Sequence, residues 1–150
     1  MIKRYTRKEM AEIWSDETRF KTYLDVEIAV LEAYSELNLI PDKVVEHIRN
    51  NARIDVKRIE EIEKITNHDI IAFVEQIEET IGDSSRYFHR GLTSSDIIDT
   101  STNLLLIKAT NLLIEDLVKL SKTLKEKSFE YKDVIQIGRT HGVHAEPITL

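Results

Sequence analysis

The chain of 150 residues contains no cysteine, two prolines and four glycines. The absence of cysteine excludes disulfide bonds, thiolate metal ligands and a cysteine nucleophile, and this composition is typical of proteins in a reducing compartment. Proline and glycine are the residues that most often interrupt secondary structure. Their scarcity therefore favours long helices over a fold built from short strands and turns.

The chain also lacks an excess of positive charge and long apolar segments. It contains 21 lysines and arginines against 27 aspartates and glutamates, a net charge of −6, so we expect no nucleic-acid partner. No segment approaches the roughly 18 consecutive apolar residues that span a membrane, and the N-terminus lacks the apolar core of a signal peptide. We expect a cytoplasmic, mostly helical protein that makes no membrane contact.

Apolar residues recur at helical spacing along most of the chain, and capping residues divide them into helices. A capping box formed by Thr6 and Glu9 is predicted to begin the first helix. A second helix is predicted to begin at Ser15 or Asp16 and to end before Pro41. Three further helices are predicted over residues 42–51, from Asp55, and over residues 69–81, with Gly82 as a C-terminal cap.

Residues 95–131 contain neither glycine nor proline, and their apolar residues keep one helical pattern. We predict a single helix of about 35 residues, which at 1.5 Å per residue is roughly 50 Å long. A helix of this length is typical of a bundle that continues elsewhere or across subunits. The stretch 134–147 breaks the helix, and we expect Pro147 in the first turn of another one. The sequence thus predicts an all-α fold and reads as the beginning of a longer protein.

Four of the five histidines lie in predicted breaks between helices, namely His68, His89, His141 and His144. An ordinary histidine pKa of about 6.5 suits proton transfer near neutral pH. The clustering with hydroxyl and amide residues indicates a site, whereas a single loop histidine is more often a cap or a surface residue. His141 and His144 are accompanied by no His-Glu-x-x-His pattern and no cysteine, so we expect no metal site.

The stretch "GLTSSD", residues 91–96, precedes the long predicted helix. It lacks the Gly-x-x-x-x-Gly-Lys frame of a phosphate-binding loop. Its hydroxyl groups and the first backbone N–H groups of the helix can still bind an anion, because the helix dipole is positive at this end. The alternative is that Thr93 and Ser94 only cap the helix, and the sequence leaves both interpretations open.

These motifs resemble those of the fumarase/aspartase superfamily. The stretch "GRTHGVHAEP", residues 138–147, is similar to the second segment that its members share, and "HRGLTSSDIIDT", residues 89–100, is similar to the first. "KRY" at 3–5 and "TNHD" at 66–69 resemble the adenylosuccinate lyase family in particular. The resemblance implies an N-terminal helical domain, residues 1–92, followed by the start of the family's central long-helix bundle, residues 93–150.

The resemblance also implies an activity and its residues. Members of this family release fumarate from adenylosuccinate, and from the succinylated carboxamide ribotide of purine biosynthesis, by a β-elimination that needs no cofactor. By position, His141 resembles the general acid that protonates the leaving nitrogen, whereas His144 is given no catalytic role. The other positions resemble substrate-binding residues: Arg4 and Tyr5 for the nucleotide, Asn67, His68 and Asp69 as a triplet, Thr93 and Ser94 for the succinyl carboxylate, and His89 and Thr140 as further contacts.

The chain departs from the family at the general base. The family's base is a serine in a mobile loop with the signature Ser-Ser-x-Met-Pro-x-Lys-x-Asn, and neither Ser84–Ser85 nor Ser94–Ser95 is followed by Met-Pro. We therefore expect the base outside these residues and no turnover by this chain alone. The family forms homotetramers that share active sites between subunits. Two alternatives stay open: another lyase of the superfamily, such as one acting on argininosuccinate, and a non-catalytic helical module for assembly.

Overall fold

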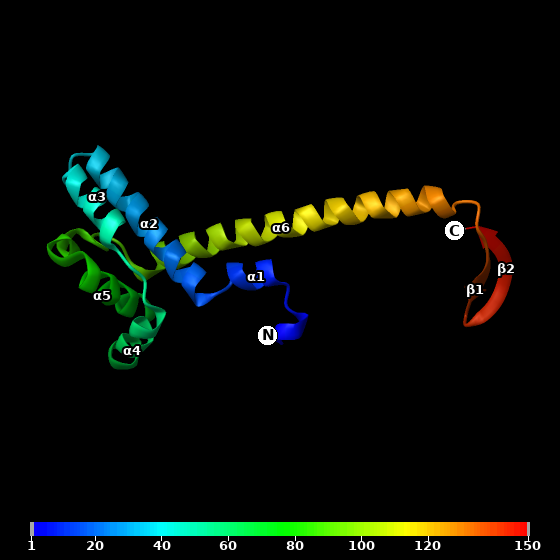
Figure 1. The fold of residues 1–150 in the computed structure, drawn as a ribbon, viewed down its shortest axis with the longest axis horizontal. Helices are drawn as coiled ribbons and strands as arrows, with labels where there is room; N and C mark the ends of the chain where they lie inside the picture. Colours follow the sequence, from blue (N-terminus) through cyan, green and yellow to red (C-terminus); the bar gives the residue numbers. More distant parts are fainter. Residues whose placement is uncertain (1, 150) are drawn as a thin grey trace. The chain divides into compact units, whose positions relative to one another are not determined.

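The computed structural model describes residues 2–149 (Figure 1). The chain forms two compact units, the first ending at Ala109 and the second beginning at Thr110. The six helices predicted before residue 134 are all present. The elements in chain order are the 3₁₀ helix η1 (Lys3–Tyr5), α1 (Lys8–Ile13), α2 (Asp16–Glu36), α3 (Asp42–Asn51), α4 (Val56–Thr66), α5 (Asp69–Ile81), the 3₁₀ helix η2 (Gly82–Tyr87), α6 (Ser94–Tyr131), β1 (Ile135–Thr140) and β2 (Val143–Thr149).

Residues at the helix ends explain where three of these helices begin or stop. Ser15 Oγ accepts a hydrogen bond from the backbone N–H of Thr18 (3.2 Å) at the start of α2. Asp55 caps α4 by accepting from two backbone N–H groups at 3.0 and 3.1 Å. Gly82 follows α5 with a φ of +53°, a conformation that glycine adopts without steric cost. These three predicted helix boundaries are confirmed.

The capping box predicted for the first helix is wrong. Arg7 precedes α1, and in the described structure its side chain makes no capping hydrogen bond. The hydroxyl group of Thr6 instead donates to the carbonyl oxygen of Ile2 (3.0 Å), and Glu9 forms an ion pair with Arg7 (3.2 Å). Because both side chains are engaged elsewhere, neither reaches the backbone N–H group of the other residue.

An aromatic cluster forms the centre of the first unit. The side chain of Phe73 on α5 is fully buried and stacks on Phe20 of α2, with 6.0 Å between the ring centroids. Tyr23 meets the Phe73 ring edge to face at 5.6 Å, and Phe88 in the loop before α6 lies 6.2 Å away. Isoleucines complete this core: Ile40, Ile48, Ile59, Ile62, Ile70, Ile77, Ile81 and Ile97.

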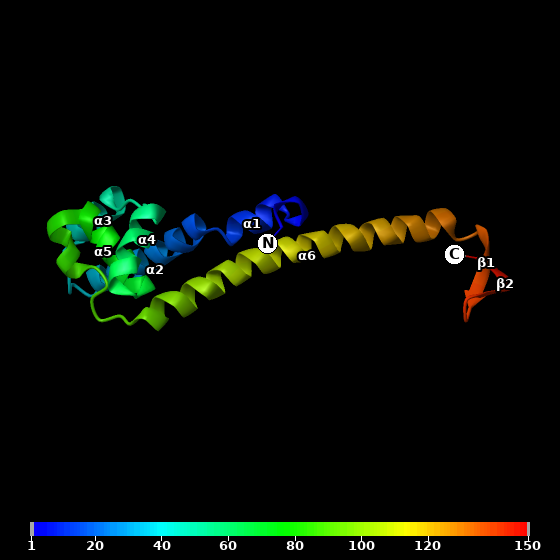
Figure 2. The same cartoon turned by 90° about the horizontal axis from the view of Figure 1, so that it is seen from below.

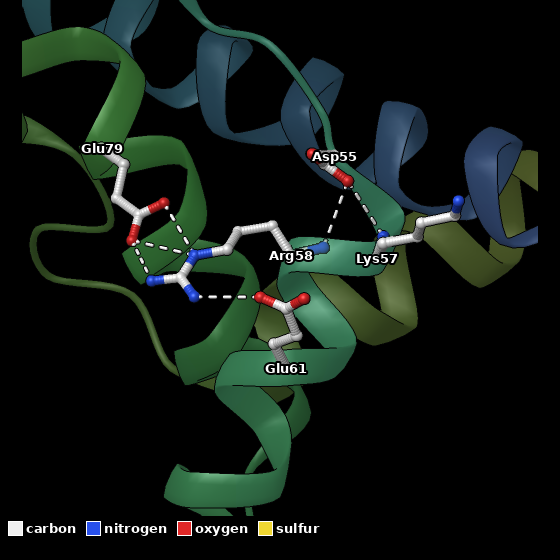
Figure 3. A network of polar contacts seen from close by, with 5 residues as sticks. All are labelled: Asp55, Lys57, Arg58, Glu61 and Glu79. Atoms are coloured by element: carbon white, nitrogen blue, oxygen red, sulfur yellow. Dashed lines mark hydrogen bonds and ion pairs between the residues drawn. The ribbon is translucent and has the colours of Figure 1, made fainter.

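Polar contacts hold α4 against α5 (Figure 3). Arg58 of α4 binds the carboxylate of Glu79 through two nitrogens, Nη2 at 2.7 Å and Nε at 3.1 Å, and also contacts Glu61 at 3.1 Å. This guanidinium group holds the pKa of Glu79 below its usual range. The buried amide oxygen of Gln76 on α5 accepts from the backbone N–H of Asp55 (3.2 Å). The two helices are therefore joined by side chains as well as by the apolar core.

Helix α6 is continuous over 38 residues (Figures 1 and 2). One face of its first half is buried in the first unit, since Ile97, Ser101, Leu105 and Ala109 recur at every fourth position. From Thr110 to the end of the helix, no residue in the described chain is buried. The first unit therefore buries only the first part of this long helix. Among residues 2–149, no helix combines the length and apolar character required to cross a membrane.

Residues 135–149 form an antiparallel hairpin, so the prediction of a second helix beginning at Pro147 is wrong. Pro147 lies in β2, opposite Ile137 of β1. Both strands of a two-stranded sheet are edges, and an edge tolerates a residue without an N–H donor. The register shifts at Gly138, where an added Cβ would lie 3.1 Å from the carbonyl oxygen of Glu146. A side chain at this β-bulge would therefore lie unusually close to the opposite strand.

The predicted all-α fold is confirmed up to the end of α6. In the described residues, the β1–β2 hairpin is the part that differs from this prediction. The first sixteen residues of α6, up to Ala109, belong to the first compact unit. The division into domains 1–92 and 93–150 concerns a longer assembly and stays a prediction.

Candidate active site

The triplet Asn67, His68 and Asp69 forms the connection between α4 and α5. Asn67 ends α4 in the left-handed conformation (φ +52°), which asparagine adopts more readily than most residues. His68 Nδ1 accepts from the backbone N–H of Ile71 (3.4 Å), and Asp69 Oδ1 accepts from that of Ile70 (2.8 Å). These two side chains remain 41% and 53% exposed, so they cap α5 and can still meet a ligand.

His89 lies in the loop between η2 and α6 and contacts a buried acid. Its φ is +52°, and its Nδ1 atom lies 2.6 Å from Oε1 of Glu27 on α2. The Glu27 side chain is 1% exposed and that of His89 is 22% exposed. Burial raises the pKa of Glu27, and the hydrogen bond with His89 opposes this rise. Burial also raises the pKa of Glu78 on α5, with Glu75 adding to the rise and His89 opposing it.

Thr93 and Ser94 lie at the start of α6. The backbone N–H of Thr93 donates to Asp96 Oδ2 (2.8 Å), and the backbone N–H of Asp96 donates to the Thr93 carbonyl oxygen (3.0 Å). Asp96 therefore performs the part of a capping box in which an acidic side chain reaches back to the residue before the helix. Thr93 is exposed and Ser94 is half-buried. Asp96 therefore engages the backbone of Thr93 and not its hydroxyl group.

Thr140 and His141 lie at the tip of the hairpin. His141 and Gly142 form the two-residue turn, with φ values of +50° and +77°, and Thr140 pairs with Val143. Two positive φ values are typical of the type I′ turn that joins two strands most tightly. The break expected around His141 is therefore confirmed, as a hairpin turn rather than a gap between helices. Thr140, His141 and Gly142 are all exposed.

Arg139 and His144 pair across the hairpin. They lie opposite each other in register, and Arg139 Nη2 is 3.2 Å from His144 Nε2. A guanidinium group can only donate, so Nε2 of His144 is the acceptor in this contact. Both residues are exposed. His144 thus has a partner within the hairpin, three residues after His141.

Arg4 and Tyr5 belong to the short 3₁₀ helix η1. The guanidinium carbon of Arg4 lies 4.8 Å from the centroid of the Tyr5 ring, a cation–π contact. Both residues are exposed, and Tyr5 is 74% exposed. The pair presents one positive charge beside an aromatic face.

The candidate residues fall into four groups. Within residues 2–149, no hydrogen bond or ion pair joins one group to another: Arg4 and Tyr5, Asn67 to Asp69, His89 to Ser94, and Thr140 and His141. Non-glycine residues with positive φ nevertheless collect in these groups, since Asn67, His89 and His141 are three of four in the described chain. Such conformations are enriched at functional sites. Also within residues 2–149, no cluster of three or more His, Asp or Glu side chains is arranged to hold a metal ion.

Glu27 is the residue near these groups that sequence reasoning missed. It lies on α2 among Phe20, Tyr23, Leu31 and other apolar residues that form the buried face of the helix. Acidic side chains are almost never fully buried without a partner. A glutamate on an apolar helical stripe was therefore the available signal, although the sequence did not reveal that His89 is its partner.

Comparisons with known proteins place these observations in a family. A family model described as lyase matches residues 3–150. The adenylosuccinate lyase of Thermotoga maritima is 50% identical over 147 residues, 98% of this chain and 34% of that protein. The adenylosuccinate lyase of Bacillus subtilis is 48% identical over 149 residues, 99% of this chain and 35% of that protein. The chain thus spans about a third of the length of these relatives.

Solved structures agree with this assignment. The fumarate lyase of Mesorhizobium sp. BNC1 matches with a TM-score of 0.85 and 27% identity, over 97% of this chain and 36% of that one. The 3-carboxy-cis,cis-muconate lactonizing enzyme of Pseudomonas putida matches with a TM-score of 0.86 and 32% identity, over 97% of this chain and 35% of that one. The fold is therefore shared by enzymes that act on different small carboxylic acids.

Proposed function

Since this chain belongs to the lyase family, whose model matches residues 3–150, we propose that it forms part of an adenylosuccinate lyase. This enzyme cleaves adenylosuccinate into AMP and fumarate, and cleaves the succinylated carboxamide ribotide of purine biosynthesis in the same way. The observation that carries the proposal is the identity of about half of all residues with adenylosuccinate lyases, which extends over nearly the whole chain. The expected cytoplasmic location belongs to the same proposal.

His141 is the general acid of the proposed reaction. A base removes a proton from the succinyl carbon next to a carboxylate, the electron pair of that C–H bond forms the new double bond, and the C–N bond breaks. The departing nitrogen keeps the electron pair of the C–N bond and takes the proton from His141. The exposed turn of His141 and Gly142 supports this role, because it brings the imidazole to the end of the hairpin where a ligand can reach it. Positioned acids of this kind contribute about 10²- to 10⁴-fold to a rate.

Thr93 and Ser94 bind the carboxylate next to which the carbanion forms. The difficult step places further negative charge on a group that is already charged, so preorganised donors there lower the barrier. The hydroxyl groups of Thr93 and Ser94 lie at the start of α6, where the helix dipole adds a partial positive charge. The contact with Asp96 involves the backbone of Thr93, so it leaves the Thr93 hydroxyl group for the substrate.

The remaining candidate residues bind the rest of the substrate. Arg4 pairs with the phosphate group, for which a planar guanidinium is well suited, and Tyr5 contacts the nucleotide. The Asn67–Asp69 triplet offers amide, imidazole and carboxylate groups from one connection between helices. His89 and Thr140 are further contacts. The general base is a serine outside these residues, so the chain alone is expected to catalyse no turnover.

The assembled enzyme is proposed to be a homotetramer whose active sites take residues from several subunits. The second half of α6 supports this assembly. Leu113, Leu117, Leu120 and Leu124 are spaced by four, three and four residues, and each is between 53% and 63% exposed. This is the seam spacing of helices that pack together in bundles. Candidate residues on one chain then need not meet each other, because they meet residues of another subunit.

A chimera tests the proposed reaction. In it, these 150 residues replace the matching part of a complete adenylosuccinate lyase, which supplies the missing base. We expect the chimera to convert adenylosuccinate to AMP and fumarate, followed by ultraviolet absorbance and by chromatography, and the 150-residue chain alone to convert none. Argininosuccinate, aspartate and fumarate are the comparison substrates. A chimera that folds and prefers one of these would assign the chain to a different lyase, and a folded chimera inactive on all four would favour the non-catalytic module.

A further inference from the structure

Glu27 is a buried carboxylic acid that the proposed reaction does not use. It lies in the middle of α2, is 1% exposed, and its Oε1 atom is 2.6 Å from Nδ1 of His89, 62 residues further along the chain. Burying a carboxylate away from water has a high free-energy cost unless it is paired and hydrogen-bonded. A short contact of this kind with a buried carboxylate is strong and directional. Glu27 therefore constrains where the His89 ring lies and how it is oriented.

The loop that carries His89 is fixed on both sides of this residue. Phe88 inserts into the aromatic core beside Phe73, and Tyr34 Oη donates to the carbonyl oxygen of Arg90 (3.0 Å). Tyr34 follows Glu27 by seven residues, which is about two turns of α2, so both contacts come from the same side of that helix. The left-handed backbone of His89 is thus held by contacts before it, at it and after it, as a strained conformation at a functional site requires.

The contact determines which nitrogen of His89 remains for a ligand. A carboxylate can only accept, so the Nδ1 atom of His89 carries a proton in both the neutral and the charged form of the ring. Within residues 2–149, Nε2 of His89 has no hydrogen-bond partner. Nε2 is then an acceptor in the neutral ring and a donor to a carboxylate or phosphate in the charged ring. If Nδ1 were not held, the proton could occupy either nitrogen and the ring could rotate.

We propose that Glu27 is a positioning residue for His89, which keeps the proton on Nδ1 and thereby presents Nε2 to the bound substrate. The part of this inference that rests on the proposed function is the contact between His89 and the substrate. The assignment of the tautomer depends on the folded chain alone. The two parts can therefore be tested separately.

The first test measures the tautomer in the 150-residue chain. With ¹⁵N-labelled histidine, long-range ¹H–¹⁵N spectra distinguish a protonated from an unprotonated ring nitrogen. At a pH at which the ring is neutral, we expect the proton of His89 on Nδ1. In Glu27→Gln the amide can accept through its oxygen or donate through its nitrogen, so we expect a mixture of the two tautomers. Glu32→Gln, on the same helix but paired with Arg49, is the matched control and should leave the His89 signals unchanged.

A wild-type ring with the proton on Nε2 would overturn the proposal without any variant, so the test does not depend on Glu27→Gln folding. Glu27→Asp provides a second variant, because it keeps the charge but is one methylene too short for the contact. We expect it to lose the preference for the Nδ1 tautomer as well. Spectra of His89 that are identical in the wild type and in folded Glu27→Gln would contradict the proposal.

The second test measures catalysis in the chimera. We expect Glu27→Gln to raise KM for adenylosuccinate by about tenfold or more, as the loss of a well-placed hydrogen bond to a charged group predicts, with a smaller change in kcat. A purely structural role of Glu27 would instead lower kcat in proportion to the folded fraction and leave KM unchanged. An unchanged KM would therefore refute the positioning role. If the parent chimera has no lyase activity, the proposed function fails, and the tautomer measurement still decides the role of Glu27.

Discussion

The loop that carries His89 gives a quantitative prediction for Gly91→Ala. Gly91 has a φ of +75°, and an added Cβ would lie 3.0 Å from the Tyr34 hydroxyl oxygen. The left-handed backbone costs alanine about 1–2 kcal/mol relative to glycine. The hydroxyl group must also move away from the Arg90 carbonyl oxygen, which it contacts at 3.0 Å, and this loss costs about 0.5–1.5 kcal/mol. We therefore expect Gly91→Ala to lower the free energy of unfolding by about 1.5–3.5 kcal/mol.

A double-mutant cycle with Tyr34→Phe separates the two contributions. Phenylalanine has no hydroxyl group to displace, so in that background Gly91→Ala should cost only the backbone strain. The coupling energy measured by urea unfolding, with far-ultraviolet circular dichroism as the signal, is expected to be about 0.5–1.5 kcal/mol. Additivity within about 0.3 kcal/mol would show that the Tyr34 contact does not constrain this loop, and the reasoning would be refuted.

Two further predictions concern the contact between α4 and α5. Ile59→Ala should destabilise the chain by about 2–5 kcal/mol in urea unfolding, because Ile59 is 0% exposed. Ile65→Ala on the same helix should change the stability by no more than about 0.5 kcal/mol, because Ile65 is 80% exposed. Equal effects of the two variants would contradict the described core. Arg58 lowers the pKa of Glu79, so the stabilisation from this pair is present above the ordinary glutamate pKa and is lost as the pH falls through the lowered value. Unfolding midpoints between pH 7 and pH 3 should therefore depend less on pH in Glu79→Gln than in the wild type, and parallel pH profiles would count against the pair.

The helical part of the fold could be predicted because its signals are local. Ser15 and Asp55 begin helices through hydrogen bonds to residues only a few positions away, and Gly82 ends a helix through its own positive φ. Such signals are readable in a single sequence. The same holds for the absence of breaks along α6. The Thr6 prediction failed although it was local, because that hydroxyl group bonds to the preceding turn instead.

The hairpin could not be predicted from the same local signals. The stretch 134–147 predicts a break followed by a helix at Pro147, but β-strand pairing depends on which residues face each other across the turn. Once Ile137 and Pro147 are paired, Gly138 is explained by its closeness to the opposite strand, and Gly142 by its positive φ. The periodicity of a short apolar segment does not distinguish a strand from the start of a helix.

The candidate site was predicted as a set of residues but not as an arrangement. The motifs located Asn67, His89 and His141 at breaks, and the structure places all three at positive φ. The contact between Glu27 and His89 joins residues 62 positions apart, and no local pattern reports it. In the proposed assembly other subunits complete the site, and the sequence of one chain carries no local signal for which residues would meet.

The most direct test of the central claim compares two histidines of one hairpin in the chimera. His141 and His144 are both exposed and lie three residues apart, so their replacement by alanine perturbs the same local structure. We expect His141→Ala to lower kcat for adenylosuccinate by about 10²-fold or more, as the loss of a general acid predicts, and His144→Ala to change it by only a few-fold. Losses of equal size in the two variants, or full activity in His141→Ala, would contradict the assignment of His141 as the general acid.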